Sequence, residues 1–313
     1  MKTATPRILI VSACDWRFMP LLRDMMASIA PMLARDDVAM ACFDIGLNDA
    51  DRAWLMQSGV QITKPSAHFG LKAEDYSPAL LSFLARPFLP EYFPGHDIYI
   101  WIDSDVWLQN LDVLTRYING ATETGFAVTH ESDPGYRLQP WLLGWTAKHF
   151  VLGYGPLSAG YLLSQRHLNA GMFAAIAGAP QWKAWAQRYQ AAIQRSGALV
   201  PHDQFALNHA LYRPAARKTP AAAATFLDPS NNWICDRGVP MWHDTKRAFC
   251  KPYAPFEIIG AMHLAGPAKR RRYTIRRTGG GAFETFLVRG ACPEHPGQSV
   301  LTAENNAPAA AAA

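Results

Sequence analysis

The first hundred residues alternate between short apolar runs and segments whose apolar residues recur at helical spacing. Short apolar runs bounded by turn residues are typical of buried strands, and apolar residues three or four apart are typical of amphipathic helices. This alternation predicts an α/β fold with a mostly parallel central sheet flanked by helices. The predicted strands are 7–13, 38–43, 60–63 and 98–102, and the predicted helices are 20–33, 49–57 and 78–89.

After residue 110 the pattern is less regular. A helix at 181–195 carries its aromatic residues on one stripe, which indicates a side that faces the core. The segment 213–257 is rich in Pro and Ala and is expected to form long loops with little regular structure. We find no internal repeat and no linker between two domains. Short strands are expected at 126–129, 168–173 and 257–264.

The most informative segment is Ile98-Tyr-Ile-Trp-Ile-Asp103-Ser-Asp105. Five consecutive apolar residues suit a strand covered on both faces, and open α/β sheets bind ligands at the carboxyl ends of such strands. Alternation in extended backbone sends Asp103 and Asp105 to the same side, where the two carboxylates repel each other unless a cation lies between them. A divalent metal is the natural occupant. Asp-x-Asp triplets also occur as loop residues or helix caps, so the triplet by itself leaves both interpretations open.

Length and composition limit the class of protein. The chain has 313 residues, half of them apolar, which is enough for a substantial core in one large domain or two small ones. No apolar run approaches the roughly 20 residues that span a bilayer, and residues 8–14 fit a core strand better than a signal peptide. The five cysteines are scattered without a Cys-x-x-Cys pair, so neither a disulfide framework nor a thiolate zinc site is indicated. We expect reduced thiols and a cytoplasmic location.

The net charge of +5 is concentrated near the end of the chain. Residues 269–277 carry six positive charges in nine residues and no acidic one. Such a cluster is compatible with a nucleic acid, an anionic membrane surface or phosphate groups as partner. It is also compatible with a solvated tail that binds nothing.

Polar residues recur in later segments where packing alone does not call for them. Asn169 and Gly171 interrupt an apolar strand, and both residue types weaken a strand unless another group approaches closely. Asp203 and Gln204 open a helix, where the aspartate can cap the helix, face a site, or do both. Further along, an imidazole, a glycine and a lysine follow at intervals of three residues, at His263, Gly266 and Lys269.

Taken in order, these segments resemble the retaining glycosyltransferases of family 8, which include glycogenin and the bacterial lipopolysaccharide galactosyl- and glucosyltransferases. The resemblance extends from about residue 7 to residue 270. Each segment is weak alone, but the complete series in family order is specific. The matching segments are 12–18, 84–86, 103–105, 169–171, 203–204, loosely 227–232, and 263–269.

The chain also departs from the family pattern. Arg270 and Arg271 follow the last lysine where Pro-Trp is usual, and Trp101 stands where Leu commonly precedes Asp-x-Asp. The opening loop reads Cys-Asp-Trp at 14–16 rather than Asp-Asp-Asn/His. These departures affect the expected base contacts and the choice of acceptor more than metal binding.

The resemblance implies a GT-A type nucleotide-sugar-binding domain over residues 1–267, followed by a basic extension at 268–313 with a disordered, Ala-rich end. It implies that Asp103, Asp105 and His263 bind Mn²⁺, with Mg²⁺ as the alternative. A metal at this place would neutralise the diphosphate of a nucleotide-sugar donor as it leaves. The other residues implied to bind the donor are Ala13, Asp15, Arg86, Ser104, Gly171, Gly266 and Lys269.

The resemblance further implies that Asn169, Asp203 and Gln204 bind the sugar and line the face of its anomeric carbon. Retention of configuration can follow two routes, and both stay open. In one, Asp203 or Gln204 acts as a nucleophile below the ring. In the other, departure and attack use the same face, and the leaving phosphate takes the proton of the acceptor.

We therefore expect a metal-dependent transferase that moves a hexose, from UDP-glucose or UDP-galactose, to a glycan or a lipid-linked saccharide. We expect no nucleic-acid partner, and we hypothesise peripheral contact with the inner membrane face through residues 269–277. A nucleotidyltransferase and a non-catalytic nucleotide-sugar-binding module are the alternatives. The first would call for a glycine-rich phosphate loop after the first strand, and residues 12–17 contain no glycine.

Overall fold

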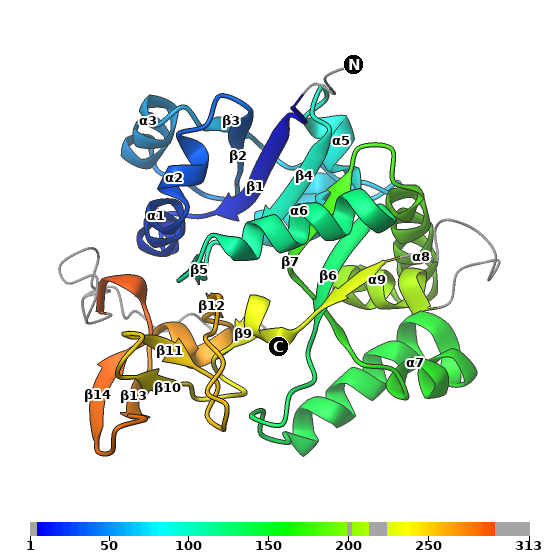
Figure 1. Cartoon of the computed structure of the whole chain (residues 1–313). Coiled ribbons are helices and arrows are strands. Elements are labelled where there is room, and N and C mark those ends of the chain that lie inside the picture. Colours follow the sequence, from blue (N-terminus) through cyan, green and yellow to red (C-terminus); the bar gives the residue numbers. More distant parts are fainter. Residues whose placement is uncertain (1–4, 199–201, 213–223, 292–313) are drawn as a thin grey trace.

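The computed structural model (Figure 1) describes residues 5–198, 202–212 and 224–291, which are organised around a seven-stranded sheet. The strand order is β3-β2-β1-β4-β7-β6-β8. Only β7 runs against the other six strands, and it lies between β4 and β6. The predicted α/β class with a mostly parallel sheet is therefore confirmed. The strands are β1 Ile8–Cys14, β2 Val38–Asp44, β3 Gln61–Thr63, β4 Ile98–Ile102, β6 Phe126–His130, β7 Leu168–Ile176 and β8 Thr225–Leu227.

Helices cover both faces of this sheet (Figure 1). Alternate residues of β4 enter two different core clusters. Ile98, Ile100 and Ile102 pack with α1 and α6, while Tyr99 and Trp101 pack with α4 and α8 on the opposite face. Burial on both faces explains the five consecutive apolar residues. The helices are α1 Met19–Ser28, α2 Ala30–Leu33, α3 Asp49–Gln57, α4 Pro78–Ala85, α5 Leu89–Tyr92, α6 Asp112–Thr124, α7 Pro140–Leu163, α8 Pro180–Ser196 and α9 His202–Tyr212.

Smaller sheets lie beyond the carboxyl end of β4 (Figure 1). The most important has the order β5-β12-β9, in which β5 pairs antiparallel with β12 and places His263 opposite Val106. This pairing brings two segments more than 150 residues apart in the sequence to one place. The strands of the smaller sheets are β5 Val106–Leu108, β9 Trp233–Ile234, β10 Met241–His243, β11 Ala248–Cys250, β12 Ala261–His263, β13 Arg272–Arg276 and β14 Ala282–Phe286.

The basic segment near the end of the chain is part of the folded structure over its described residues. β13 and β14 form an antiparallel hairpin, in which Ile275 is fully buried. Ile275 belongs to a C-terminal cluster of buried side chains that also includes Trp107, Trp233 and Leu287. The alternative of a solvated tail is therefore wrong for residues 268–291. The Ala-rich end that we expected to be disordered, within 292–313, lies outside the described residues.

The predicted elements up to residue 102 agree with the structure, except that two predicted helices are divided. Ile29 separates α1 from α2, and the 3-10 turn Arg86–Phe88 divides the predicted helix 78–89 into α4 and α5. Later elements differ more. The segment 213–257 was expected to form loops with little regular structure, and its described part, 224–257, also contains β8 to β11, strands of two or three residues that are too short to show alternation. Residues 213–223 lie outside the described residues. The sequence reading also missed α6 and α7. α7 is apolar on almost every side and contains glycine and proline, so it shows no helical stripe.

The packing of the hairpin gives a first testable prediction. Ile275→Ala removes a fully buried side chain from the C-terminal cluster and should lower the free energy of unfolding by about 2–5 kcal/mol. Thr274→Ala is the matched control, because the adjacent side chain is exposed and should cost less than about 1 kcal/mol. Urea unfolding measures both variants, and equal stabilities would contradict the observed packing.

Candidate functional site

The backbone fixes both aspartates at the end of β4. The Asp103 N–H donates to the Gly171 carbonyl of β7 at 2.8 Å, and the Val106 N–H donates back to the Asp103 carbonyl at 3.0 Å. On the other side, the Leu264 N–H donates to the Asp105 carbonyl at 2.9 Å. The two carboxylates are thus held between the main sheet and the small sheet that contains β12.

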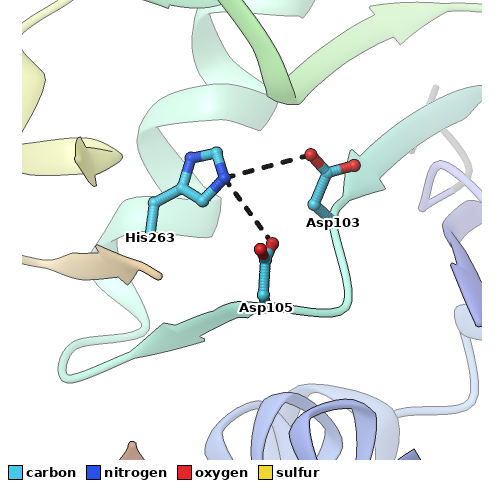
Figure 2. A group of neighbouring side chains, drawn as sticks. All are labelled: Asp103, Asp105 and His263. Carbon is cyan, nitrogen blue, oxygen red and sulfur yellow. Dashed lines mark ion pairs between the residues drawn. The ribbon is translucent and has the colours of Figure 1, made fainter. Parts of the chain in front are cut away.

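Asp103, Asp105 and His263 converge on one point (Figure 2). The His263 Nε2 lies 3.6 Å from Asp105 Oδ1 and 4.0 Å from Asp103 Oδ2. One ligand atom from each residue lies within 4.8 Å of the others. Two carboxylate oxygens and one imidazole nitrogen form a donor set that suits Mn²⁺ and similar divalent ions. The three predicted ligands therefore lie together and fit a metal.

Each carboxylate also has a cation of its own. The Arg86 guanidinium donates to Asp103 Oδ1 at 2.6 Å, and Lys269 Nζ donates to Asp105 Oδ2 at 2.6 Å. Burial raises the pKa of Asp103, with a further contribution from Asp105 and against the effect of Arg86. Burial also acts to raise the pKa of Asp105, but Lys269 and His263 outweigh it and lower that pKa. The two aspartates thus have different proton affinities although one residue separates them.

Glycine at position 171 allows two of the candidate ligands, Asp103 and His263, to approach the sheet closely. A Cβ atom there would lie 2.5 Å from His263 Cε1 and 2.8 Å from Asp103 Oδ2, closer than real Cβ contacts. The sequence reading expected a close approach at this strand glycine. The groups that approach are the side chains of the candidate metal ligands.

Seven of the predicted site residues line one cleft of about 270 Å³ beside the ligand cluster. In it, Asp15 Oδ1 accepts hydrogen bonds from the Arg17 and Phe18 N–H groups and fixes the turn after β1. The predicted residues that do not line this cleft are Asn169, Gly171, Asp203, Gln204, His263 and Gly266. The seven that do are Ala13, Asp15, Arg86, Asp103, Ser104, Asp105 and Lys269.

Gly266 acts through the backbone. It has a positive φ of 59° and begins the short 3-10 helix Gly266–Lys269. A left-handed conformation of this kind favours glycine. The resulting turn returns the chain to Asp105, which Lys269 then contacts.

Arg86 is the centre of a buried ion-pair network. Its guanidinium donates to Asp103 and, at 2.5 Å, to Asp203 Oδ2, and it lies 4.6 Å from the centroid of the Trp101 ring. The Trp101 Nε1–H in turn donates to Asp103 Oδ1 at 2.7 Å. Tryptophan at this position, a departure from the family pattern, therefore contacts both partners of the ion pair. Asp203 lies in the first turn of α9 and is connected to the ligand cluster through Arg86.

The side chains of Asn169 and Gln204 both donate hydrogen bonds to Glu131, a residue that was not predicted from the sequence. Glu131 Oε1 accepts from Asn169 Nδ2 at 2.6 Å and from Gln204 Nε2 at 3.2 Å, and Oε2 pairs with Arg237 at 2.7 Å. Burial acts to raise the pKa of Glu131, but Arg237 and His167 outweigh it and lower that pKa. The available signal was its position one residue after β6, at the same edge of the sheet as Asp103.

A second and larger cleft, of about 740 Å³, lies on the Glu131 side. Its polar wall includes Glu131, His167 and Arg237, and its apolar wall includes Leu138, just before α7, and Leu142 in its first turn. The smaller cleft thus contains Asp103 and Asp105 of the ligand cluster, and the larger cleft contains Glu131 of the Asn169–Glu131–Gln204 network.

No protein-family model and no curated protein matches the chain. Solved structures do resemble it. The galactosyltransferase LgtC, in complex with donor and acceptor sugar analogs, is 14% identical over 83% of this chain and 88% of its own, with a TM-score of 0.49. The bifunctional glycosyltransferase WbbM is 13% identical over 85% of this chain and 47% of its own, with a TM-score of 0.48. The glycosyltransferase GlyE from Streptococcus pneumoniae is 13% identical over 74% of this chain and 47% of its own, with a TM-score of 0.44. Similarity at this level concerns the fold, and the argument for function rests on the site.

The close approach at Gly171 gives a second prediction. Gly171→Ala should displace His263 or Asp103 and weaken Mn²⁺ binding by about tenfold or more, as disturbed support of metal ligands commonly does. Isothermal titration with Mn²⁺ measures the affinity. Gly178→Ala is the control, since no atom lies within 4 Å of the Cβ position there and affinity should not change. Equal affinities for the two variants would rule out the assigned ligand geometry.

Proposed function

We propose that the chain is a metal-dependent glycosyltransferase of the retaining type. It transfers a hexose from a nucleotide sugar, UDP-glucose or UDP-galactose, to a glycan or a lipid-linked saccharide. One observation carries the proposal. The cluster of Asp103, Asp105 and His263 stands at the edge of a cleft that also contains Lys269 and the turn after β1. Together with the ordered series of family motifs, this arrangement supports a GT-A type donor site over residues 1–267.

The residues of the cleft suit a diphosphate leaving group. Mn²⁺, or alternatively Mg²⁺, bound by Asp103, Asp105 and His263 supplies positive charge that stabilises a departing diphosphate. Lys269 adds a second positive charge, because its ammonium already lies against Asp105 at the wall of the cleft. Arg86 is buried and bonded to two aspartates, so in this proposal it orients Asp103.

The contacts of the two candidate nucleophiles favour one of the routes to retention. Asp203 is buried in an ion pair with Arg86. Gln204 Oε1 accepts from the Ala170 N–H at 3.0 Å, and its amide nitrogen donates to Glu131. Both side chains are thus committed to protein partners. This favours departure and attack on the same face, with Asn169, Asp203 and Gln204 positioning the sugar from below.

The larger cleft is the proposed place of the acceptor. Glu131 carries a negative charge there, beside Asn169 and Gln204, and can accept hydrogen bonds from saccharide hydroxyl groups. The apolar wall from α7 can cover a ring face or an aglycone. A saccharide in this cleft would lie next to Glu131, which binds Asn169 and Gln204.

We also propose a cytoplasmic location with peripheral contact to an anionic membrane. In this proposal residues 268–291 are a basic extension packed on the 1–267 unit. The outward side of β13 exposes Arg272 and Arg276, which supports contact of the 269–277 segment with anionic headgroups. Within the described residues, no helix is long and apolar enough to cross a membrane.

A third prediction tests the proposed activity. With Mn²⁺ present, the protein should slowly release UDP from UDP-glucose or UDP-galactose. Asp105→Asn should reduce the rate by about 100-fold or more, because the metal loses a charged ligand. Asp112→Asn is the control, because this exposed aspartate lies outside both clefts.

The same assay separates the alternatives. A nucleotidyltransferase would join the nucleotide to an acceptor, and a binding module would retain the sugar nucleotide unchanged. Full UDP release in EDTA would contradict metal dependence. NMR of the product linkage reports whether the anomeric configuration is retained.

A further inference from the structure

The longest helix, α7, exposes an unusual amount of apolar surface. Among the described residues, eight of the eleven exposed large apolar side chains lie between Leu138 and Leu163. Leu157 is 89% exposed, Leu138 82% and Trp141 67%. Figure 1 shows α7 at the edge of the molecule, away from the main sheet. Contiguous apolar surface of this kind marks an interaction site.

α7 is anchored by one side only. Phe150 and Leu162 pack with Phe205 of α9 in a small cluster, and this holds the helix on the body of the protein. The rest of the helix is also apolar, so it has no polar face to turn toward water. A helix that is apolar on all sides is normally buried completely, by protein or by lipid. The helix breaks at Gly155, where φ is 77° and ψ is 167°, and Leu157 is exposed just beyond the break.

Within residues 138–163 the charged side chains have one sign, while Glu131, Asp133 and Asp228 lie across the cleft that Leu138 and Leu163 help to line. Residues 138–163 include no acidic side chain, and their only lysine, Lys148, is exposed. Arg137 and Arg166 are exposed at either end of the segment. Apolar side chains with exposed tryptophans and a rim of basic residues are the composition of helices that lie in a membrane interface.

We propose that α7 docks on an anionic lipid bilayer, with its exposed leucines and tryptophans at the headgroup–acyl boundary and Lys148 and Arg166 against lipid phosphates. A second copy of the chain fits this surface less well. A symmetric contact through α7 would bring two sets of like charges together without an acidic partner. The inference does not depend on the proposed transferase activity. The surface shares Leu138 and Arg166 with the wall of the larger cleft, and it is distinct from the 269–277 segment.

Vesicle co-sedimentation of the full chain tests the proposal. The protein should bind vesicles of phosphatidylcholine and phosphatidylglycerol more strongly than vesicles of phosphatidylcholine alone. The triple variant Leu138→Ser/Trp141→Ser/Leu157→Ser should lower the partition coefficient by about tenfold or more, because apolar burial in the interface is lost. Lys148→Glu/Arg166→Glu should remove the preference for anionic vesicles.

Two controls keep the result specific. Met56→Ser/Phe226→Ser removes exposed apolar side chains on α3 and β8, and should bind vesicles like the unmodified chain. Arg272→Ser/Arg276→Ser tests the other basic surface. The proposal fails if the unmodified protein ignores anionic vesicles, or if only the arginine variant loses binding. It fails equally if sedimentation velocity shows a dimer that the triple variant converts to a monomer.

Discussion

The site depends on the close approach of two acidic side chains, Asp103 and Asp105, which are separated by one residue and largely removed from water. Burial and mutual repulsion both disfavour two negative charges at Asp103 and Asp105. Arg86, from one segment, and His263 and Lys269, from another, lie against these carboxylates. Removing one partner of a buried charge leaves the other uncompensated, which is costly. The convergence of these segments is therefore a condition for a stable site.

Two features of the fold satisfy that condition. The pairing of β5 with β12 fixes His263 next to Asp105. β5 begins directly after Asp105, and β12 ends at His263. The fork of Arg86 joins Asp103 to Asp203 and thereby connects the end of β4 to the start of α9. Trp101 supports this connection, because its ring packs against the Arg86 guanidinium and its N–H donates to Asp103. The geometry of the candidate site and the stability of the fold thus depend on the same contacts.

The distribution of polar groups also divides the site into two halves. One part is the smaller cleft, which Lys269 and Arg86 line together with the carboxylates of Asp15, Asp103 and Asp105. In the other part, Glu131 binds the amides of Asn169 and Gln204 and lines the larger cleft. Under the proposed function, the first part would hold the anionic donor and the second the hydroxyl-bearing acceptor.

The sequence by itself determined the α/β class, the two-sided burial of β4 and the placement of Asp103 and Asp105 at its end. These features depend on local periodicity, which short-range backbone geometry imposes. The motifs and their order also named the three residues of the candidate metal cluster and seven residues of the smaller cleft. Only the tertiary structure decided that Arg86 bonds Asp203, that Glu131 joins Asn169 to Gln204, and that the basic hairpin is packed on Trp107. Such contacts depend on strand order and on the pairing of segments far apart in the chain, for which no local pattern carries a signal.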